Sequence, residues 1–262
     1  MPNEAAHAQA ARMNWLVAFA GIIGAIFGSF IATIVVRWPG GRSVLAGRSA
    51  CDHCGHALAW HDLVPIVSWL VARGRCRHCG GRISAVHLAI ELNCAAIGIA
   101  AFALLPVPQA CAAFVLGLLL VPLGWLDALH LWLPDRLTLA LAVGGVWGGR
   151  VLHQLAPMDQ ALGAVAGFGS LWLVALAFRR IRGKDGLGAG DPKLLGALGL
   201  WVGWQILPFI VLIAAMTGLI WALLIRVSGR MSEGMIWNWQ LPLGTLLAIA
   251  GFLVQFGTLS AN

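Results

Sequence analysis

The feature that most constrains this chain is a long uncharged run near its N-terminus. Residues 14–36, NWLVAFAGIIGAIFGSFIATIVV, contain no charged side chain in 23 positions. A helix of about 20 apolar residues crosses the hydrocarbon core of a bilayer, and this run is too long for the apolar core of a cleavable signal peptide. We therefore expect residues 14–36 to form a retained transmembrane helix, preceded by a short tail at residues 1–13.

The remainder of the chain is also too apolar for an ordinary soluble domain. Hydrophobic residues make up 60% of the sequence and charged residues 10%. Further apolar blocks lie at 83–104, 107–126, 136–154, 160–178, 193–206, 207–225 and 240–257. We predict an all-α polytopic membrane protein with about eight transmembrane helices, in which residues 83–262 form one bundle and the lipid bilayer is a partner. Glycine pairs that let helices approach closely occur at Gly24 and Gly28, Gly144 and Gly148, and Gly163 and Gly167.

The basic residues predict the orientation of these spans, because Lys and Arg near span ends stay on the cytoplasmic side. With the N-terminus outside, residues 37–82 lie inside, and only Arg12 and Arg150 of the 17 lysines and arginines fall on the other side. The net charge of +7 is thus explained by topology. We expect no nucleic-acid partner, because such a partner would require basic and aromatic residues on one soluble surface.

Acidic residues stand at the predicted cytoplasmic mouth of the bundle. Asp191 lies in GLGAGDPKLLG, and Asp127 and Asp135 lie in LDALHLWLPDRLT. Asp191 could be an N-cap followed by proline, and Asp135 could cap the helix that follows it. Asp127 has no adjacent helix start to cap, and an acid near membrane depth usually serves function. Two carboxylates that share one proton could activate water and polarise a peptide carbonyl, which is the chemistry of an aspartic peptidase.

The predicted cytoplasmic segment, residues 37–82, carries two CxxC pairs separated by 21 residues. This spacing is typical of a tetrahedral zinc site of the ribbon type, with the ligands Cys51, Cys54, Cys76 and Cys79. Two disulfides are the alternative, which the reducing cytoplasm disfavours. Histidines that could replace a ligand lie in the same segment, at His53, His56, His61 and His78. Cys94 and Cys111 fall inside predicted spans and are expected to act as small apolar residues.

Four ordered motifs resemble those of the type IV prepilin peptidase family. They are GSFIATIVVRWP (28–39), LVPIVSWLVARGRCRHCGGRIS (63–84), DALHLWLPDRLTL (127–139) and GAGDPKLLGALGLWVGW (188–204). The resemblance implies that Asp127 and Asp191 form the catalytic pair, that Asp135 is not catalytic, and that the four cysteines of the CxxC pairs bind zinc. It also implies a multi-pass protein of the bacterial inner membrane, with its zinc segment and active site on the cytoplasmic side.

The resemblance further implies the substrate and a second reaction. The family removes the basic leader from type IV prepilins or type II secretion pseudopilins, cutting after a glycine. It then methylates the new N-terminal amine with S-adenosylmethionine. One departure bears on that second activity: the chain has His87 and Leu88 where the family has Tyr-Pro before a glutamate. Glu91 remains, as a weak candidate for cofactor contact or as the partner of His87 in an ion pair.

Two alternatives stay open at this point. One is a peptidase that has lost methylation. The other belongs to a different class, a zinc-stabilised membrane transporter or scaffold whose aspartates bind a proton or cation. Cleavage of a prepilin would distinguish the peptidase from the transporter.

Overall fold

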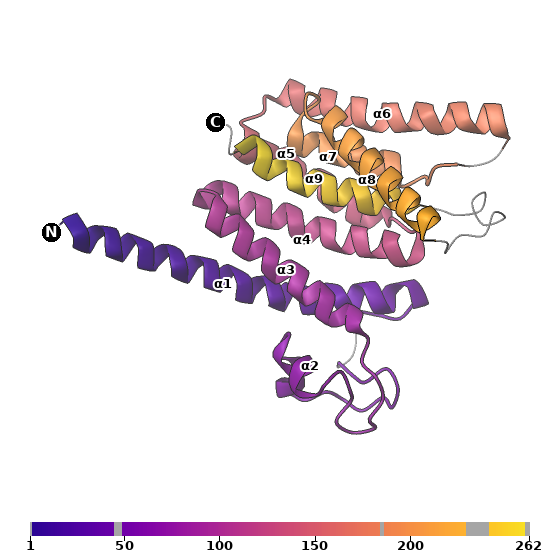
Figure 1. Cartoon of the computed structure of the whole chain (residues 1–262). Coiled ribbons are helices and arrows are strands. Elements are labelled where there is room, and N and C mark those ends of the chain that lie inside the picture. The colour runs from indigo at the N-terminus through magenta and orange to yellow at the C-terminus, as the bar shows by residue number, and fades with distance from the viewer. Residues whose placement is uncertain (1, 45–48, 184–185, 229–240, 260–262) are drawn as a thin grey trace. The chain divides into compact units, whose positions relative to one another are not determined.

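The computed structural model describes residues 2–44, 49–183, 186–228 and 241–259, and these ranges contain helices and two isolated bridges but no strand. Each of the eight blocks predicted from the sequence forms a helix (Figure 1). Helix α1 begins within the segment predicted as a tail. The helices are α1 (Pro2–Arg37), α3 (Ala85–Leu104), α4 (Val107–His130), α5 (Asp135–His153), α6 (Pro157–Arg182), α7 (Asp191–Val202), α8 (Leu207–Val227) and α9 (Leu243–Leu259).

Five of these helices, α1, α3, α4, α6 and α8, are long and apolar enough to cross a membrane by length and composition. The prediction of an all-α multi-pass membrane protein is thus confirmed, whereas the number of eight spans is not. Helix α7 has 12 residues and extends about 18 Å. It is shorter than the hydrocarbon core of a bilayer, which is about 30 Å thick.

The chain forms two compact units, residues 1–122 and 123–262. In the first unit, α1 packs along α3 at positions where only glycine fits. A Cβ atom at Gly24 would lie 2.3 Å from the carbonyl oxygen of Cys94, and one at Gly98 would lie 2.4 Å from that of Ala20. The expected role of the first glycine pair in close packing is confirmed.

A loop connects α1 to α3 in the first unit, and its described residues, 38–44 and 49–84, contain short helical elements and two isolated bridges. The helical elements are the 3-10 turns η1 (Trp38–Gly40) and η2 (Trp60–Leu63) and the five-residue helix α2 (Val67–Val71). The loop carries all four cysteines of the CxxC pairs. The predicted insertion between the first and second long helices is therefore present.

Helix α7 is an interior element of the second unit, where it packs against α5, α6 and α9. All of its residues except Lys193 and Leu200 are buried. The fully buried Trp201 donates a hydrogen bond from Nε1 to the carbonyl oxygen of Leu141 at 2.8 Å. Toward α6, the packing is equally close: a Cβ atom at Gly163 of α6 would lie 2.4 Å from the carbonyl oxygen of Gly199. Neighbouring helices thus position α7, and with it the residue at which it begins.

Candidate active site and candidate metal centre

Asp127 lies in the last turns of α4 and is buried. Its Oδ2 atom accepts a hydrogen bond from the backbone N–H of Thr245 at 2.7 Å, and Oγ1 of Thr245 lies 3.2 Å from the same atom. Thr245 is the third residue of α9, where backbone N–H groups have no partner within the helix. No helix begins near Asp127 in the sequence, but in space its carboxylate lies at the start of α9. These hydrogen bonds and the helix N-terminus stabilise a negative charge on its carboxylate.

Asp191 is the first residue of α7 and is also buried. The helix is capped by Gly190 and by no side chain, so the alternative interpretation of Asp191 as an N-cap is wrong. Asp191 lies outside the five apolar spans. Its pKa is raised to about 7, first because burial disfavours the charged carboxylate and second because the charge of Asp127 lies close by, although a hydrogen bond with the backbone of Gly188 lowers it.

The two acids belong to the same unit, and the chain around them is tightly packed. A Cβ atom at Gly244 would lie 3.0 Å from Cγ of Asp127 and 2.8 Å from Cδ1 of Leu133. A Cβ atom at Gly190, the neighbour of Asp191, would lie 2.6 Å from Cβ of the same leucine. The side chain of Leu133 thus packs against the backbone beside both acids. Asp127 and Asp191 therefore lie in one tightly packed region. Glycine occupies the two positions, Gly244 of α9 and Gly190 before α7, where the backbone comes closest to Leu133.

Asp135 has a different environment. It is the first residue of α5, whose N-cap is Pro134 with no side-chain cap, so the predicted capping role of Asp135 is wrong. Its side chain is 73% exposed, and Oδ1 forms an ion pair with Nζ of Lys193 at 2.5 Å. The geometry therefore separates Asp135 from the buried acids.

Two residues of this site were not anticipated from the sequence, Thr245 and Gly244. They lie in LPLGTLLAIA at the start of α9, more than a hundred positions from Asp127. The only local signal was a glycine and a threonine at the beginning of an apolar run. That signal does not reveal that the helix starts beside an acid on another helix.

The four cysteines of the loop converge on one point. The Sγ atoms of Cys51, Cys54, Cys76 and Cys79 all lie within 4.8 Å of one another, and all four are free thiols. The disulfide alternative is not realised in the structure. Four thiolates around one centre match the donor set and the tetrahedral geometry of a structural zinc site.

The two CxxC pairs adopt the same backbone arrangement. In the first, the N–H of Gly55 donates to Cys51 O at 2.9 Å, and in the second, the N–H of Gly80 donates to Cys76 O at 2.9 Å. Both glycines have a φ of +70°, a left-handed conformation that glycine adopts without strain. The histidines stay outside the cluster: His56 stacks on His78 with ring centroids 4.2 Å apart. The four sulfur atoms are thus presented by two similar turns.

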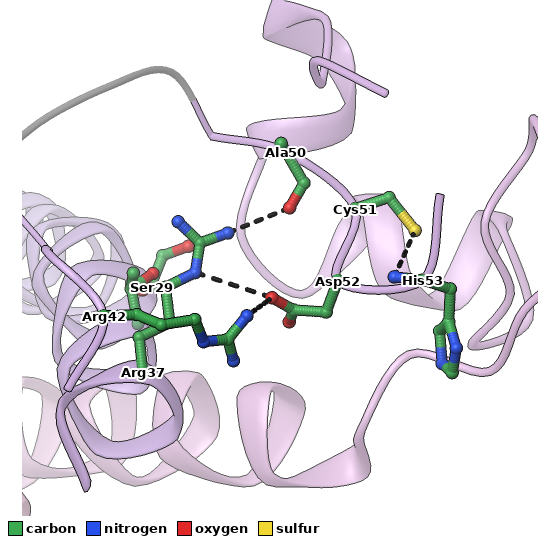
Figure 2. A network of polar contacts seen from close by, with 8 residues as sticks. Ser29, Arg37, Arg42, Ala50, Cys51, Asp52 and His53 are labelled. Carbon is green, nitrogen blue, oxygen red and sulfur yellow. Dashed lines mark hydrogen bonds and ion pairs between the residues drawn. The ribbon is translucent and has the colours of Figure 1, made fainter. Parts of the chain in front are cut away.

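Charged contacts join this cluster to the end of α1 (Figure 2). The guanidinium of Arg37 donates to Ala50 O at 2.9 Å, next to the first cysteine, and Nε lies 3.7 Å from Oδ1 of Asp52. Arg42 donates to the same carboxylate oxygen at 2.7 Å. Within one CxxC turn, the N–H of His53 approaches Cys51 Sγ at 3.4 Å. The cysteine loop is therefore attached to a membrane helix through side chains as well as through the chain itself.

Glu91 of α3 is buried, and its Oε2 atom accepts a hydrogen bond from the backbone N–H of Ile66 at 2.6 Å. The side chain of Ser29 on α1 also hydrogen-bonds this carboxylate. The expected ion pair with His87 is absent among the described contacts of Glu91. The carboxylate instead connects two membrane helices to the loop, which gives it structural partners.

Comparison with known proteins agrees with this arrangement. Residues 22–105 match the bacterial peptidase A24 N-terminal domain and residues 114–223 match the type IV leader peptidase family. Three similar proteins are named prepilin leader peptidase/N-methyltransferase. They come from Burkholderia pseudomallei (strain K96243; 37% identity over 92% of this chain and 85% of the relative), Dickeya chrysanthemi (38%; 90% and 90%) and Aeromonas hydrophila (38%; 80% and 72%).

No solved structure matches the chain. The family match nevertheless covers both units, because the first domain falls on the helix pair with the cysteine loop and the second on the helices that hold the buried acids. With two matching domains and relatives of 37–38% identity over most of its length, the chain belongs to the type IV leader peptidase family.

Proposed function

We propose that this protein is a membrane-embedded aspartic endopeptidase that removes the basic leader from type IV prepilins or type II secretion pseudopilins. The observation that carries the proposal is the pair of buried carboxylates, Asp127 and Asp191, at helix ends within one unit. Membership of a leader peptidase family supports the same reaction. The bilayer is the second partner, because five helices are apolar enough to cross it.

The two acids divide the chemistry between them. Asp127 faces the N–H groups at the start of α9, so we assign the negative charge to it and the shared proton to Asp191. The charged carboxylate takes a proton from water as the water oxygen attacks the scissile carbonyl carbon. The protonated carboxyl donates to the carbonyl oxygen, which becomes a hydroxyl of the tetrahedral intermediate. As the intermediate collapses, the C–N bond breaks and the proton held by Asp127 passes to the leaving amine. One hydroxyl of the intermediate returns its proton to Asp191 as the carbonyl re-forms, which restores the starting state of the pair.

The site lies where a prepilin changes from a solvated leader to an apolar helix. We place it, together with the cysteine loop, on the cytoplasmic side of the inner membrane, because the arginines and lysines gather there under the positive-inside rule. A carboxylate pair at helix ends, rather than at the middle of a span, suits a substrate that bends from water into lipid at the cut.

We assign the cysteine cluster a structural zinc ion held by Cys51, Cys54, Cys76 and Cys79, because their sulfur atoms converge as four thiolate ligands require. The ion would stabilise a loop whose helical elements η2 and α2 bury no residue. It supplies no step of peptide cleavage in this account.

The names of the relatives also support methylation of the new N-terminal amine. S-adenosylmethionine would supply the methyl group from its sulfonium and leave as S-adenosylhomocysteine. Glu91 remains a weak candidate for donor contact. If the cysteine loop supports this second site, loss of the zinc ligands should reduce methylation at least as much as cleavage, and cleavage lost with methylation intact would argue against this division.

Mass spectrometry of a co-expressed prepilin tests both activities in one spectrum. We expect a product that lacks its leader and carries one added methyl group on the new N-terminus. A shortened product without the methyl group would identify a peptidase that does not methylate. An uncut prepilin beside stable, membrane-inserted protein would favour the transporter or scaffold instead.

A further inference from the structure

The loop between α1 and α3 carries an apolar surface that its zinc-ligating part does not explain. Trp60 is 81% exposed, Val71 65%, and Val67 and Leu70 55% each. Leu63 and Val64 are exposed as well. These six side chains lie on η2, on α2 and, for Val64, directly after η2, within residues 60–71, which we name the apolar segment. Exposed apolar surface of this density on so short a segment marks an interaction site.

The depth of the apolar segment follows from a hydrogen bond to a membrane helix. The N–H of Ile66, directly before α2, donates to Oε2 of Glu91 at 2.6 Å. Glu91 is the seventh residue of α3, a span of 20 residues that begins at Ala85. Six residues of α-helix extend about 9 Å, and a 20-residue helix just crosses the hydrocarbon core. Ile66 therefore contacts a carboxylate whose backbone lies within the span, about 9 Å from the start of α3.

A second membrane helix contacts the same carboxylate within its span. The Glu91 carboxylate also hydrogen-bonds Ser29 on α1. Ser29 lies eight residues before Arg37, the last residue of that helix, or about 12 Å along its axis. Both membrane helices thus place the carboxylate that binds Ile66 inside the span.

The backbone of the apolar segment is suited to a medium without water. Ile66 has a φ of +63°, a conformation that is costly for a β-branched residue, and the buried carboxylate satisfies its N–H group. The next backbone donors bond within the segment: Ser68 to Val64 O at 3.0 Å, and Leu70 to Ile66 O at 3.1 Å. Non-helical backbone persists at membrane depth only when its polar groups have such partners.

We propose that residues 60–71 form a re-entrant segment whose apolar side chains contact lipid acyl chains, in the leaflet on the side where α1 ends and α3 begins. Glu91 is the buried anchor that holds the turn at Ile66 at this depth. Exposed arginines follow directly, at Arg73 and Arg75, where they would meet anionic lipid headgroups. The tryptophan at the start of the segment and these cations at its end are typical of interfacial anchoring.

A photoreactive side chain at single positions of the full-length protein tests the proposal. The protein is reconstituted in vesicles of phosphatidylethanolamine and phosphatidylglycerol, and p-benzoylphenylalanine replaces Val67 or Val71 in the apolar segment. Phe19, which is 62% exposed on the α1 span, calibrates labelling by lipid. His56, exposed in the cysteine loop, is the matched loop position. This design leaves all six cysteines and Glu91 intact.

We expect lipid adducts by mass spectrometry at Val67 and Val71 in yields comparable to that at Phe19. They should exceed the yield at His56 by about tenfold or more, because the acyl-chain region excludes water. Yields at Val67 and Val71 no higher than at His56 would overturn the proposal. So would crosslinks from these positions to residues 123–262, which would make the apolar segment a contact between the two units, or to an added prepilin, which would make it a substrate surface.

Discussion

At the scale of single residues, the two buried acids differ in what surrounds them. Asp127 accepts hydrogen bonds at the start of α9, whereas Asp191 begins its own helix without capping it. The hydroxyl of Thr245 also has the carbonyl oxygen of Gly124 as an acceptor, at 2.8 Å. Because a hydroxyl has one proton and two lone pairs, it can donate to the Asp127 carboxylate while that group is charged. When the carboxyl receives a proton, the hydroxyl can donate to Gly124 instead and accept from Asp127. The surroundings of Asp127 therefore fit a group that gains and loses a proton.

Removal of the Thr245 hydroxyl tests this arrangement. Thr245→Val keeps the backbone N–H bond to Asp127 and removes the hydroxyl, while Thr245→Ser keeps both. We expect Thr245→Val to lower the rate of prepilin cleavage by roughly fivefold, as loss of a hydrogen bond of about 1 kcal/mol implies, and Thr245→Ser to stay near the wild type. Equal rates for the two variants would show that the hydroxyl takes no part.

The raised pKa of Asp191 predicts the alkaline side of the pH profile. Its pKa is about 7, raised first by burial and then by the charge of Asp127. The proposed reaction needs one proton on the pair, and that proton is lost as the pH rises through this value. We expect cleavage by the purified protein to fall as the pH increases above about 7. A rate that stays constant between pH 7 and 9 would contradict the assignment of the proton to Asp191.

At the scale of elements, the position of Asp191 depends on the burial of α7 between its neighbours. The approach of α6 to α7 at Gly163 leaves no room for a side chain. Gly169, on the same helix, has no atom within 4 Å of where a Cβ would lie. Position 163 therefore reports on the packing of α7, and position 169 serves as its control.

We expect Gly163→Ala to lower the thermal stability of the protein by about 1–3 kcal/mol and to reduce cleavage, because α7 must shift and carry Asp191 with it. Gly169→Ala should leave both unchanged or raise stability slightly, since alanine is the better helix former. Thermal unfolding in detergent and a cleavage assay measure the two effects. A Gly163→Ala variant as stable and active as Gly169→Ala would mean that the contact does not position the site.

The cysteine loop gives a second prediction at this scale. Purified protein should contain about one zinc ion per chain, and the double variant Cys51→Ser, Cys54→Ser should contain none. Cys111→Ser, which alters an exposed cysteine of α4 outside the cluster, should keep its zinc. Metal analysis by mass spectrometry gives the result directly. Full metal content in the double variant would exclude the cysteines as ligands.

These elements also show where sequence reasoning succeeds and where it ends. Hydropathy alone located all eight helices to within a few residues of their ends in most cases, except that α1 begins at Pro2, because helix periodicity and apolar length are local properties. Hydropathy did not reveal that α7 is an interior helix, since its burial depends on glycines of α5 and α6 that are distant in sequence. The contacts of Asp127 with Thr245 and of Glu91 with Ile66 were beyond reach for the same reason.

At the scale of the whole molecule, each unit holds a distinct kind of site. The first, residues 1–122, contains the cysteine cluster and the turn anchored by Glu91. The second, residues 123–262, contains both buried acids. Because the peptidase chemistry needs only the second unit in this account, a change confined to the acids should leave membrane insertion and zinc content intact.

The most direct test of the account is prepilin cleavage by three asparagine variants. Asp127→Asn and Asp191→Asn should each abolish cleavage, because the first removes the carboxylate that takes the proton from water and the second removes the acid that donates to the carbonyl oxygen. Zinc content and insertion should persist. Asp135→Asn is the matched control, since it breaks an exposed ion pair with Lys193 worth about 1 kcal/mol or less, and it should retain substantial activity. An active Asp191→Asn variant would contradict the account, and an active Asp127→Asn beside an inactive Asp135→Asn would move the catalytic pair to Asp135 and Asp191.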